Sequence, residues 1–134
     1  MLVDDHAHMR LALRTFINAE RDLTVVAEAD RGDAALELIE HTNPDVVLMD
    51  AMMPGTNGME TTRQLKKLDP AVAIVGLTLY EEATYLEEMI AAGAKGYVLK
   101  TEAPTKVAKA IRAVAAGKTY FHGAHLPRAT KKKS

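Results

Sequence analysis

The sequence predicts an α/β domain in which five strands alternate with five helices. Short runs of β-branched and aliphatic residues alternate with segments whose apolar residues recur at helical spacing. The runs 45–49 and 72–77 are apolar in their interior, as in strands that helices cover on both faces. This alternation favours a doubly wound five-stranded parallel sheet with strand order 2-1-3-4-5, which forms the middle layer of a three-layer sandwich.

The amino-terminal half is expected to contain three strands, at 2–4, 23–29 and 45–49, with a helix after each of the first two. In the first helix, four apolar residues fall on one face: Met9, Leu13, Phe16 and Ile17. The second helix, 31–42, should end before Pro44, because the residue preceding a proline disfavours helical torsion angles.

The carboxyl-terminal half supplies the remaining elements. The expected elements are strands at 72–77 and 96–99 and helices at 58–68, 81–92 and 104–117. Pro70 and Gly93 end the first two of these helices, and Pro104 suits the first turn of the third. The pattern stops at Lys118, so we predict one domain over residues 1–117, followed by a linker or disordered tail over 118–134.

The composition excludes several classes of protein. The chain has 134 residues with a net charge of −1, so it carries no bulk positive charge for nucleic-acid binding. It contains no cysteine, which excludes a disulfide scaffold, thiolate zinc sites and cysteine catalysis. No apolar run approaches the roughly 20 residues needed to cross a bilayer. We therefore expect a cytoplasmic protein that is not embedded in a membrane.

A polar residue follows each of four apolar strands. Asp4 and Asp5 follow the first strand, Asp50 the third, Thr78 the fourth and Lys100 the fifth. In a 2-1-3-4-5 sheet the order reverses between strands 1 and 3, and ligands bind beyond the carboxyl ends of the strands at that point. These side chains are therefore expected to converge.

Such a cluster has the groups that phosphoryl transfer requires. Three close carboxylates repel one another unless they hold a proton or a cation, and oxygen ligands select hard cations such as Mg²⁺. A carboxylate can accept a phosphoryl group as an acyl phosphate. Lys100 would add a positive charge and Thr78 a hydrogen-bond donor to the transferred group.

These residues resemble the receiver domain of bacterial two-component response regulators, which has a flavodoxin-like fold. The matching segments are LVDDH (2–6), PDVVLMD (44–50), MPG (53–55), NG (57–58), LT (77–78) and AGAKGYVLK (92–100). The residues of the first and last segments are most similar to those of regulators with a LuxR-type helix-turn-helix output. The Lys-Pro pair of many receivers is replaced here by Lys100-Thr101.

The resemblance implies a role for each residue at the site. It implies that Asp50 is the phosphoacceptor and a ligand of Mg²⁺ or another hard divalent cation. Asp5 would bind the metal directly, Asp4 mainly through water, and Met52 through its backbone carbonyl.

The resemblance also implies a conformational switch. Lys100 would pair with Asp50 and then with the phosphoryl group, Thr78 would move toward that group, and Tyr97 would rotate inward. The chain would catalyse its own phosphoryl transfer and dephosphorylation without being a conventional enzyme. Its partners would be a sensor histidine kinase and, on phosphorylation, a second copy of itself. DNA would be bound only through a helix-turn-helix domain, which these 134 residues do not include. The chain is therefore expected to be a receiver cut from a longer regulator. The alternative is a stand-alone receiver.

Three other functions remain to be weighed. A degenerate receiver would act as an interaction module without phosphorylation, but the set of acidic residues and Lys100 is intact. A flavodoxin-like cofactor domain would need a Ser/Thr/Gly-rich loop after strand 1, where Asp5 and His6 stand instead. A phosphatase-like hydrolase usually has a second carboxylate two residues after its nucleophile, and position 52 is Met.

Some nearby residues are assigned lesser roles. His6 and His8 are interpreted as surface residues at the start of a helix, because Met9 replaces the glycine of a cobalamin-binding pattern. Tyr80 and Met52 should border the acceptor and restrict the attacking water, which predicts slow self-dephosphorylation.

Overall fold

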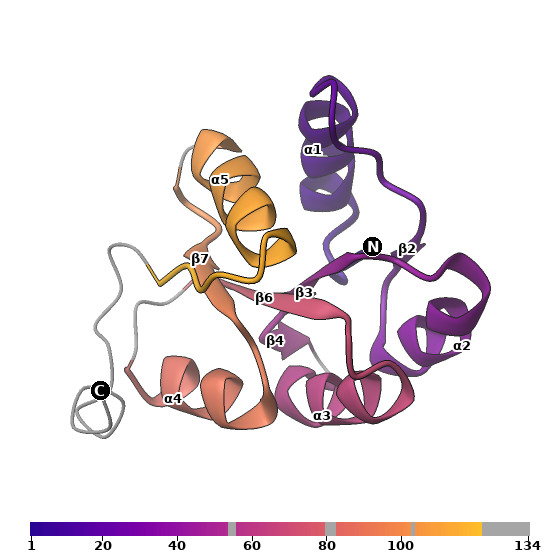
Figure 1. Cartoon of the computed structure of the whole chain (residues 1–134), viewed down its shortest axis with the longest axis vertical. Helices are drawn as coiled ribbons and strands as arrows, with labels where there is room; N and C mark the ends of the chain where they lie inside the picture. The colour runs from indigo at the N-terminus through magenta and orange to yellow at the C-terminus, as the bar shows by residue number, and fades with distance from the viewer. Residues whose placement is uncertain (54–55, 80–82, 103, 122–134) are drawn as a thin grey trace.

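A five-stranded parallel sheet forms the centre of the protein (Figure 1). The computed structural model describes residues 1–53, 56–79, 83–102 and 104–121. In spatial order the strands are β2 (Glu28–Ala29), β1 (Leu2–Val3), β3 (Val46–Asp50), β6 (Ala73–Thr78) and β7 (Gly96–Leu99). Counted along the chain without the separate pair of strands described below, this is the order 2-1-3-4-5, and the predicted topology is confirmed.

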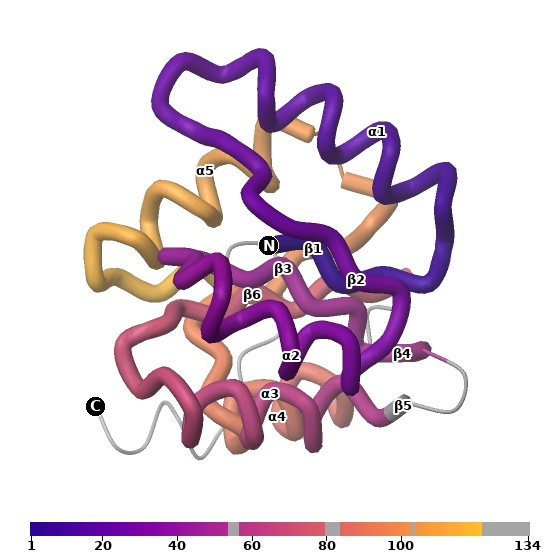
Figure 2. The backbone as a smooth tube through the Cα atoms, turned by 90° about the vertical axis from the view of Figure 1, so that its right-hand side faces the viewer, coloured from indigo at the N-terminus to yellow at the C-terminus, as the bar shows by residue number. Residues whose placement is uncertain are grey.

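Five helices cover the two faces of the sheet. Helices α1 (Ala7–Asn18) and α5 (Pro104–Ala115) lie on one face. Helices α2 (Gly32–Thr42), α3 (Gly58–Leu68) and α4 (Ala83–Ala92) lie on the other (Figures 1 and 2). Within the described residues, no helix combines the length and the apolar character needed to cross a bilayer.

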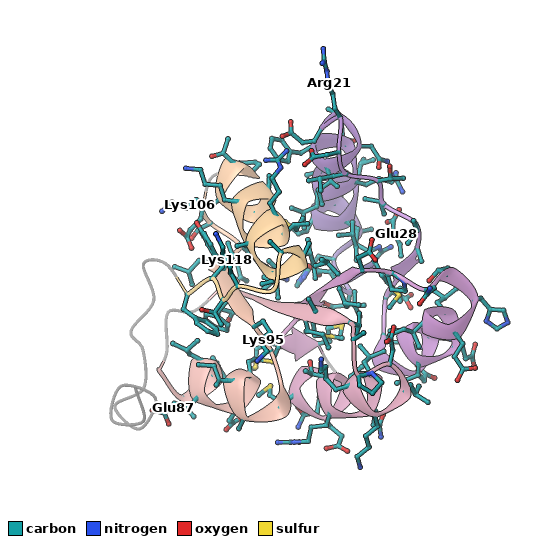
Figure 3. All side chains as sticks on the ribbon, in the orientation of Figure 1. Arg21, Glu28, Glu87, Lys95, Lys106 and Lys118 are labelled. Atoms are coloured by element: carbon teal, nitrogen blue, oxygen red, sulfur yellow. The ribbon has the colours of Figure 1, made fainter. Side chains whose placement is uncertain are left out.

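Alternate strand residues supply the two halves of the core. In β3, Val47 and Met49 pack with the α2–α4 layer, whereas Leu48 packs with Leu13 of α1 and Ile111 of α5. This follows from the pleat, because successive side chains of a strand point to opposite faces. Charged side chains such as those of Arg21, Glu87 and Lys106 point outward (Figure 3). The continuous apolar runs are therefore central strands buried on both sides, as expected.

Two strand features differ from the prediction. The strand expected at 23–29 is paired only over Glu28–Ala29, since its single neighbour in the sheet is the two-residue strand β1. A separate antiparallel pair of strands, β4 (Met52–Met53) and β5 (Thr56–Asn57), follows β3 and was not predicted.

The chain beyond α5 returns to the edge of the sheet. The backbone N–H of Tyr120 donates to the carbonyl of Lys95 at 2.9 Å, and that of Tyr97 donates to the carbonyl of Tyr120 at 2.9 Å. Phe121 packs against the core on the α2–α4 side. The domain was predicted to end at Gly117, but Tyr120 beyond it pairs with Gly96 of β7 at the edge of the sheet. Residues 122–134 lie outside the described residues.

Candidate functional site

Three charged side chains meet beyond the carboxyl ends of β1, β3 and β7. Asp4 follows β1, Asp50 ends β3 and Lys100 follows β7. The Lys100 ammonium lies 2.9 Å from Asp50 Oδ2 and 2.8 Å from Asp4 Oδ2. The three side chains are 1–3% exposed. A charge buried to this degree is tolerated only with a partner, and here one cation lies between two carboxylates.

Burial makes the ionisation of Asp50 costly. Its Oδ1 accepts a hydrogen bond from the backbone N–H of Met52 at 3.0 Å, and its Oδ2 accepts one from Lys100. Burial raises the pKa of Asp50 to about 6, although the hydrogen bonds from Met52 and Lys100 and the charge of Lys100 act in the opposite direction. The carboxylate is therefore largely ionised at neutral pH, at an energetic cost.

Lys100 remains a cation despite its burial. Burial by itself lowers the pKa of Lys100, but hydrogen bonds from its ammonium to Asp4 and Asp50, together with their charges, outweigh this, and the pKa lies above its usual value. A fixed positive charge beside Asp50 can neutralise charge on a group transferred to that carboxylate.

His6 joins the cluster, which the sequence analysis did not foresee. Its Nδ1 lies 3.0 Å from Asp4 Oδ1, 3.3 Å from Asp5 Oδ1 and 3.4 Å from Lys100 Nζ. His6 and His8 are both exposed at the start of α1, as expected, and the additional finding is the contact of the His6 ring with the carboxylates. The available signal was the position of His6 directly after two acidic residues at a strand end.

The acidic side of the cluster has the composition of a cation site. Asp4, Asp5, His6 and Asp50 each offer one ligand atom, and these four atoms all lie within 4.8 Å of one another. Three of the donors are carboxylate oxygens, which suit a hard divalent cation such as Mg²⁺. The residues present therefore fit the metal that the sequence predicted.

Backbone hydrogen bonds link Met52 to Asp50 and Thr78 to Lys100, whereas Tyr97 is buried within β7. Thr78 is fully buried at the end of β6, and its carbonyl accepts a hydrogen bond from the backbone N–H of Lys100 at 2.7 Å. The ring of Tyr97 is buried against Gly76, where an added Cβ would lie 3.0 Å from Tyr97 Cδ1. Action of the Thr78 hydroxyl on a phosphoryl group and binding of a metal by the Met52 carbonyl stay predictions. Tyr80 lies outside the described residues.

The start of α3 lies against the backbone of Asp50. Asn57 caps the helix, since its side-chain oxygen accepts hydrogen bonds from the backbone N–H groups of Met59 at 2.9 Å and Glu60 at 3.3 Å. At Gly58, an added Cβ would lie 2.4 Å from the carbonyl oxygen of Asp50. The pair Asn57-Gly58 thus allows α3 to begin close to Asp50.

Comparison with known proteins agrees with this geometry. The family model "Response regulator receiver domain" matches residues 1–112. The transcriptional regulatory protein DegU of Brevibacillus brevis is 36% identical over 122 residues, which are 91% of this chain and 52% of DegU. The chain spans between half and three fifths of the length of the curated relatives it matches.

Solved structures show the same relationship. A LuxR-family two-component response regulator from Aurantimonas sp. SI85-9A1 superposes with a TM-score of 0.87 at 36% identity, covering 92% of this chain and 88% of that one. The isolated REC domain of RcsB from Salmonella enterica, solved in the presence of the phosphomimetic BeF₃⁻, gives a TM-score of 0.80 at 25% identity, with 98% and 94% covered. Because the family model matches most of the chain, the chain belongs to the response regulator receiver domain family.

Proposed function

We propose that Asp50 accepts a phosphoryl group from the phosphohistidine of a sensor histidine kinase. The observation that carries the proposal is the buried contact of Asp50 with Lys100, 2.9 Å apart at the carboxyl edge of the sheet, with a cation-binding cluster beside it. Membership of the receiver family supports the same assignment.

The transfer forms one bond and breaks another. A carboxylate oxygen of Asp50 attacks phosphorus, the bond between phosphorus and the histidine nitrogen of the kinase breaks, and the leaving imidazole takes up a proton. The product is an acyl phosphate on Asp50. Lys100, already charged and fixed in place, neutralises the oxygens of the transferred group.

We infer that Asp4, Asp5, Asp50 and the carbonyl of Met52 hold Mg²⁺ or another hard divalent cation. When bound, such an ion neutralises the close carboxylates and the phosphoryl oxygens. Asp4 is already paired with Lys100 at 2.8 Å, which supports its more distant role through water. The half-buried Asp5 is open to direct binding.

The added phosphoryl group would then be detected by Thr78 and Tyr97. Thr78 ends the strand next to Lys100, and the backbone of Tyr97 contacts the segment that follows α5. In the whole protein we propose dimerisation on phosphorylation and transcriptional control through a DNA-binding helix-turn-helix domain, as in a cytoplasmic regulator. The family and the names of relatives such as DegU support this output.

The test is the intact mass of the chain after incubation with acetyl phosphate and Mg²⁺. The expected result is a gain of one phosphoryl group, lost with a chelator and in Asp50→Asn. A chain that stays folded and gains nothing would be an interaction module that works without phosphorylation, and the proposal would be wrong.

A further inference from the structure

We propose that the His6 imidazole is a nitrogen ligand of the metal site and makes this site favour a first-row transition cation such as Mn²⁺ over Mg²⁺. The inference rests on the metal site of the proposed function and adds a ligand to it. It concerns which divalent cation the site selects.

The position of the His6 ring is the first observation. Its Nδ1 lies 3.0 Å from Asp4 Oδ1 and 3.3 Å from Asp5 Oδ1, and it shares the 4.8 Å ligand cluster with Asp50. A cation bound by these carboxylates would therefore lie within reach of the same nitrogen. Without a cation, Nδ1 can donate its proton to Asp4 Oδ1. When a cation takes the place of that proton and the ring proton is on Nε2, the Nδ1 lone pair binds the cation.

The backbone of His6 holds the ring in this direction. The His6 N–H donates to Asp4 Oδ1 at 2.8 Å, and its carbonyl accepts from the N–H of Arg10 at 3.0 Å in the first turn of α1. His6 is the N-cap residue of α1, yet its side chain makes no capping hydrogen bond. The ring therefore contacts the acidic cluster and does not cap the helix.

The ring also remains open to a ligand from solvent. The His6 side chain is 55% exposed, while Asp4 beside it is 1% exposed. The imidazole thus lies at the outer side of a buried carboxylate, where an incoming hydrated cation would first meet the protein. A nitrogen donor at this position can replace one of the waters that the cation carries.

The chemistry of the donor decides which cation gains most. Mg²⁺ prefers oxygen ligands and loses its waters reluctantly, whereas imidazole suits first-row transition cations. Carboxylate oxygens together with one imidazole nitrogen form a mixed set that Mn²⁺ accepts. We therefore expect His6 to add affinity for Mn²⁺ and little affinity for Mg²⁺.

Pulsed EPR of the Mn²⁺-loaded chain tests the ligand directly. The expected result is a nitrogen coupling to Mn²⁺ that changes when histidine is labelled with ¹⁵N. The coupling should persist in His8→Ala, the matched control, because His8 is an exposed histidine two residues further along the chain. It should vanish in His6→Ala, and the label on the unmutated chain tests the ligand even if that variant fails to fold.

Equilibrium titrations test the selectivity. Removal of His6 should weaken Mn²⁺ binding by roughly tenfold or more, the scale of losses around metal sites, and should leave Mg²⁺ binding nearly unchanged. Mn²⁺ binding without nitrogen coupling, or equal losses for both cations, would overturn the role of His6 and leave the metal site intact. Failure of the unmutated chain to bind either cation would overturn the metal site itself.

Discussion

Asp50 carries its charge inside the protein because Lys100 and the backbone of Met52 hold its two oxygens. The pKa of about 6 shows that these partners offset only part of the cost of burial. That residual cost keeps the carboxylate reactive toward a group or a cation that would neutralise it. The sequence predicted this cluster because each member follows an apolar strand. It did not predict the direction of the His6 ring, which depends on contacts that no local pattern records.

The first prediction concerns pH and Asp50. A pKa raised in the folded state stabilises the fold below the unfolded value near 4, and this contribution is lost as the pH rises through about 6. The variant Asp50→Asn has no such loss. The difference in unfolding free energy between the variant and the unmutated chain should therefore shift in favour of the variant by about 1–3 kcal/mol from pH 4 to pH 7.5. Denaturant unfolding of both proteins in chelator measures it. A difference that does not vary with pH would show that Asp50 ionises at no cost.

The second prediction concerns Lys100. Lys100→Met leaves Asp4 and Asp50 buried without their shared cation, and should reduce the unfolding free energy of the metal-free chain by about 3–5 kcal/mol. A divalent cation should restore part of this loss, because it neutralises the same carboxylates. Lys106→Met is the matched control, since it removes only a surface pair with Glu102. Equal behaviour of the two variants in unfolding experiments would contradict the buried cluster.

At the scale of elements, helices and strands were not equally predictable. Helix α3 matches its predicted bounds, because helical periodicity and its stop signal are local. Strand β2 was predicted too long, since the length of an edge strand depends on its partner, and β1 has two residues. The segment at Tyr120 was missed for the same reason, because its pairing partner, β7, lies about 24 residues earlier in the chain.

Gly58 allows α3 to begin beside Asp50. Gly58→Ala would place a Cβ against the carbonyl of Asp50, and such overpacking should cost about 1–3 kcal/mol of unfolding free energy and slow phosphorylation. Thermal unfolding and the rate of mass gain with acetyl phosphate measure the two effects. The control is Gly117→Ala, where no atom lies within 4 Å of the added Cβ and only the backbone torsion is strained. An unaltered phosphorylation rate in Gly58→Ala would show that the position of the start of α3 does not affect the site.

The edge segment should protect the backbone of Tyr97. Tyr120→Pro removes the N–H that donates to Lys95 and should speed hydrogen exchange at the Tyr97 amide, which donates to the Tyr120 carbonyl. Tyr120→Ala keeps the backbone donor and should preserve most of the protection. If the Tyr97 amide exchanges equally fast in the unmutated chain and both variants, the segment does not hold β7.

At the scale of the whole molecule, the topology of the sheet brings the residues of the candidate site together. Order 2-1-3-4-5 brings β1 and β3 together, and the parallel direction places Asp4, Asp50 and Lys100 at one edge although they are up to 96 positions apart in the sequence. This could be predicted because alternating strands and helices permit few arrangements. The identity of the kinase could not be predicted, since the fold does not specify which partner a surface recognises.

The central claim is that Asp50, among three neighbouring carboxylates, takes the phosphoryl group. Reduction of the acetyl phosphate-treated chain with borohydride converts an acyl phosphate to an alcohol, which peptide mass spectrometry can locate. We expect homoserine at position 50 and unchanged Asp4 and Asp5. Reduction at Asp4 or Asp5, or at none of the three in a chain that has gained the mass of a phosphoryl group, would contradict it.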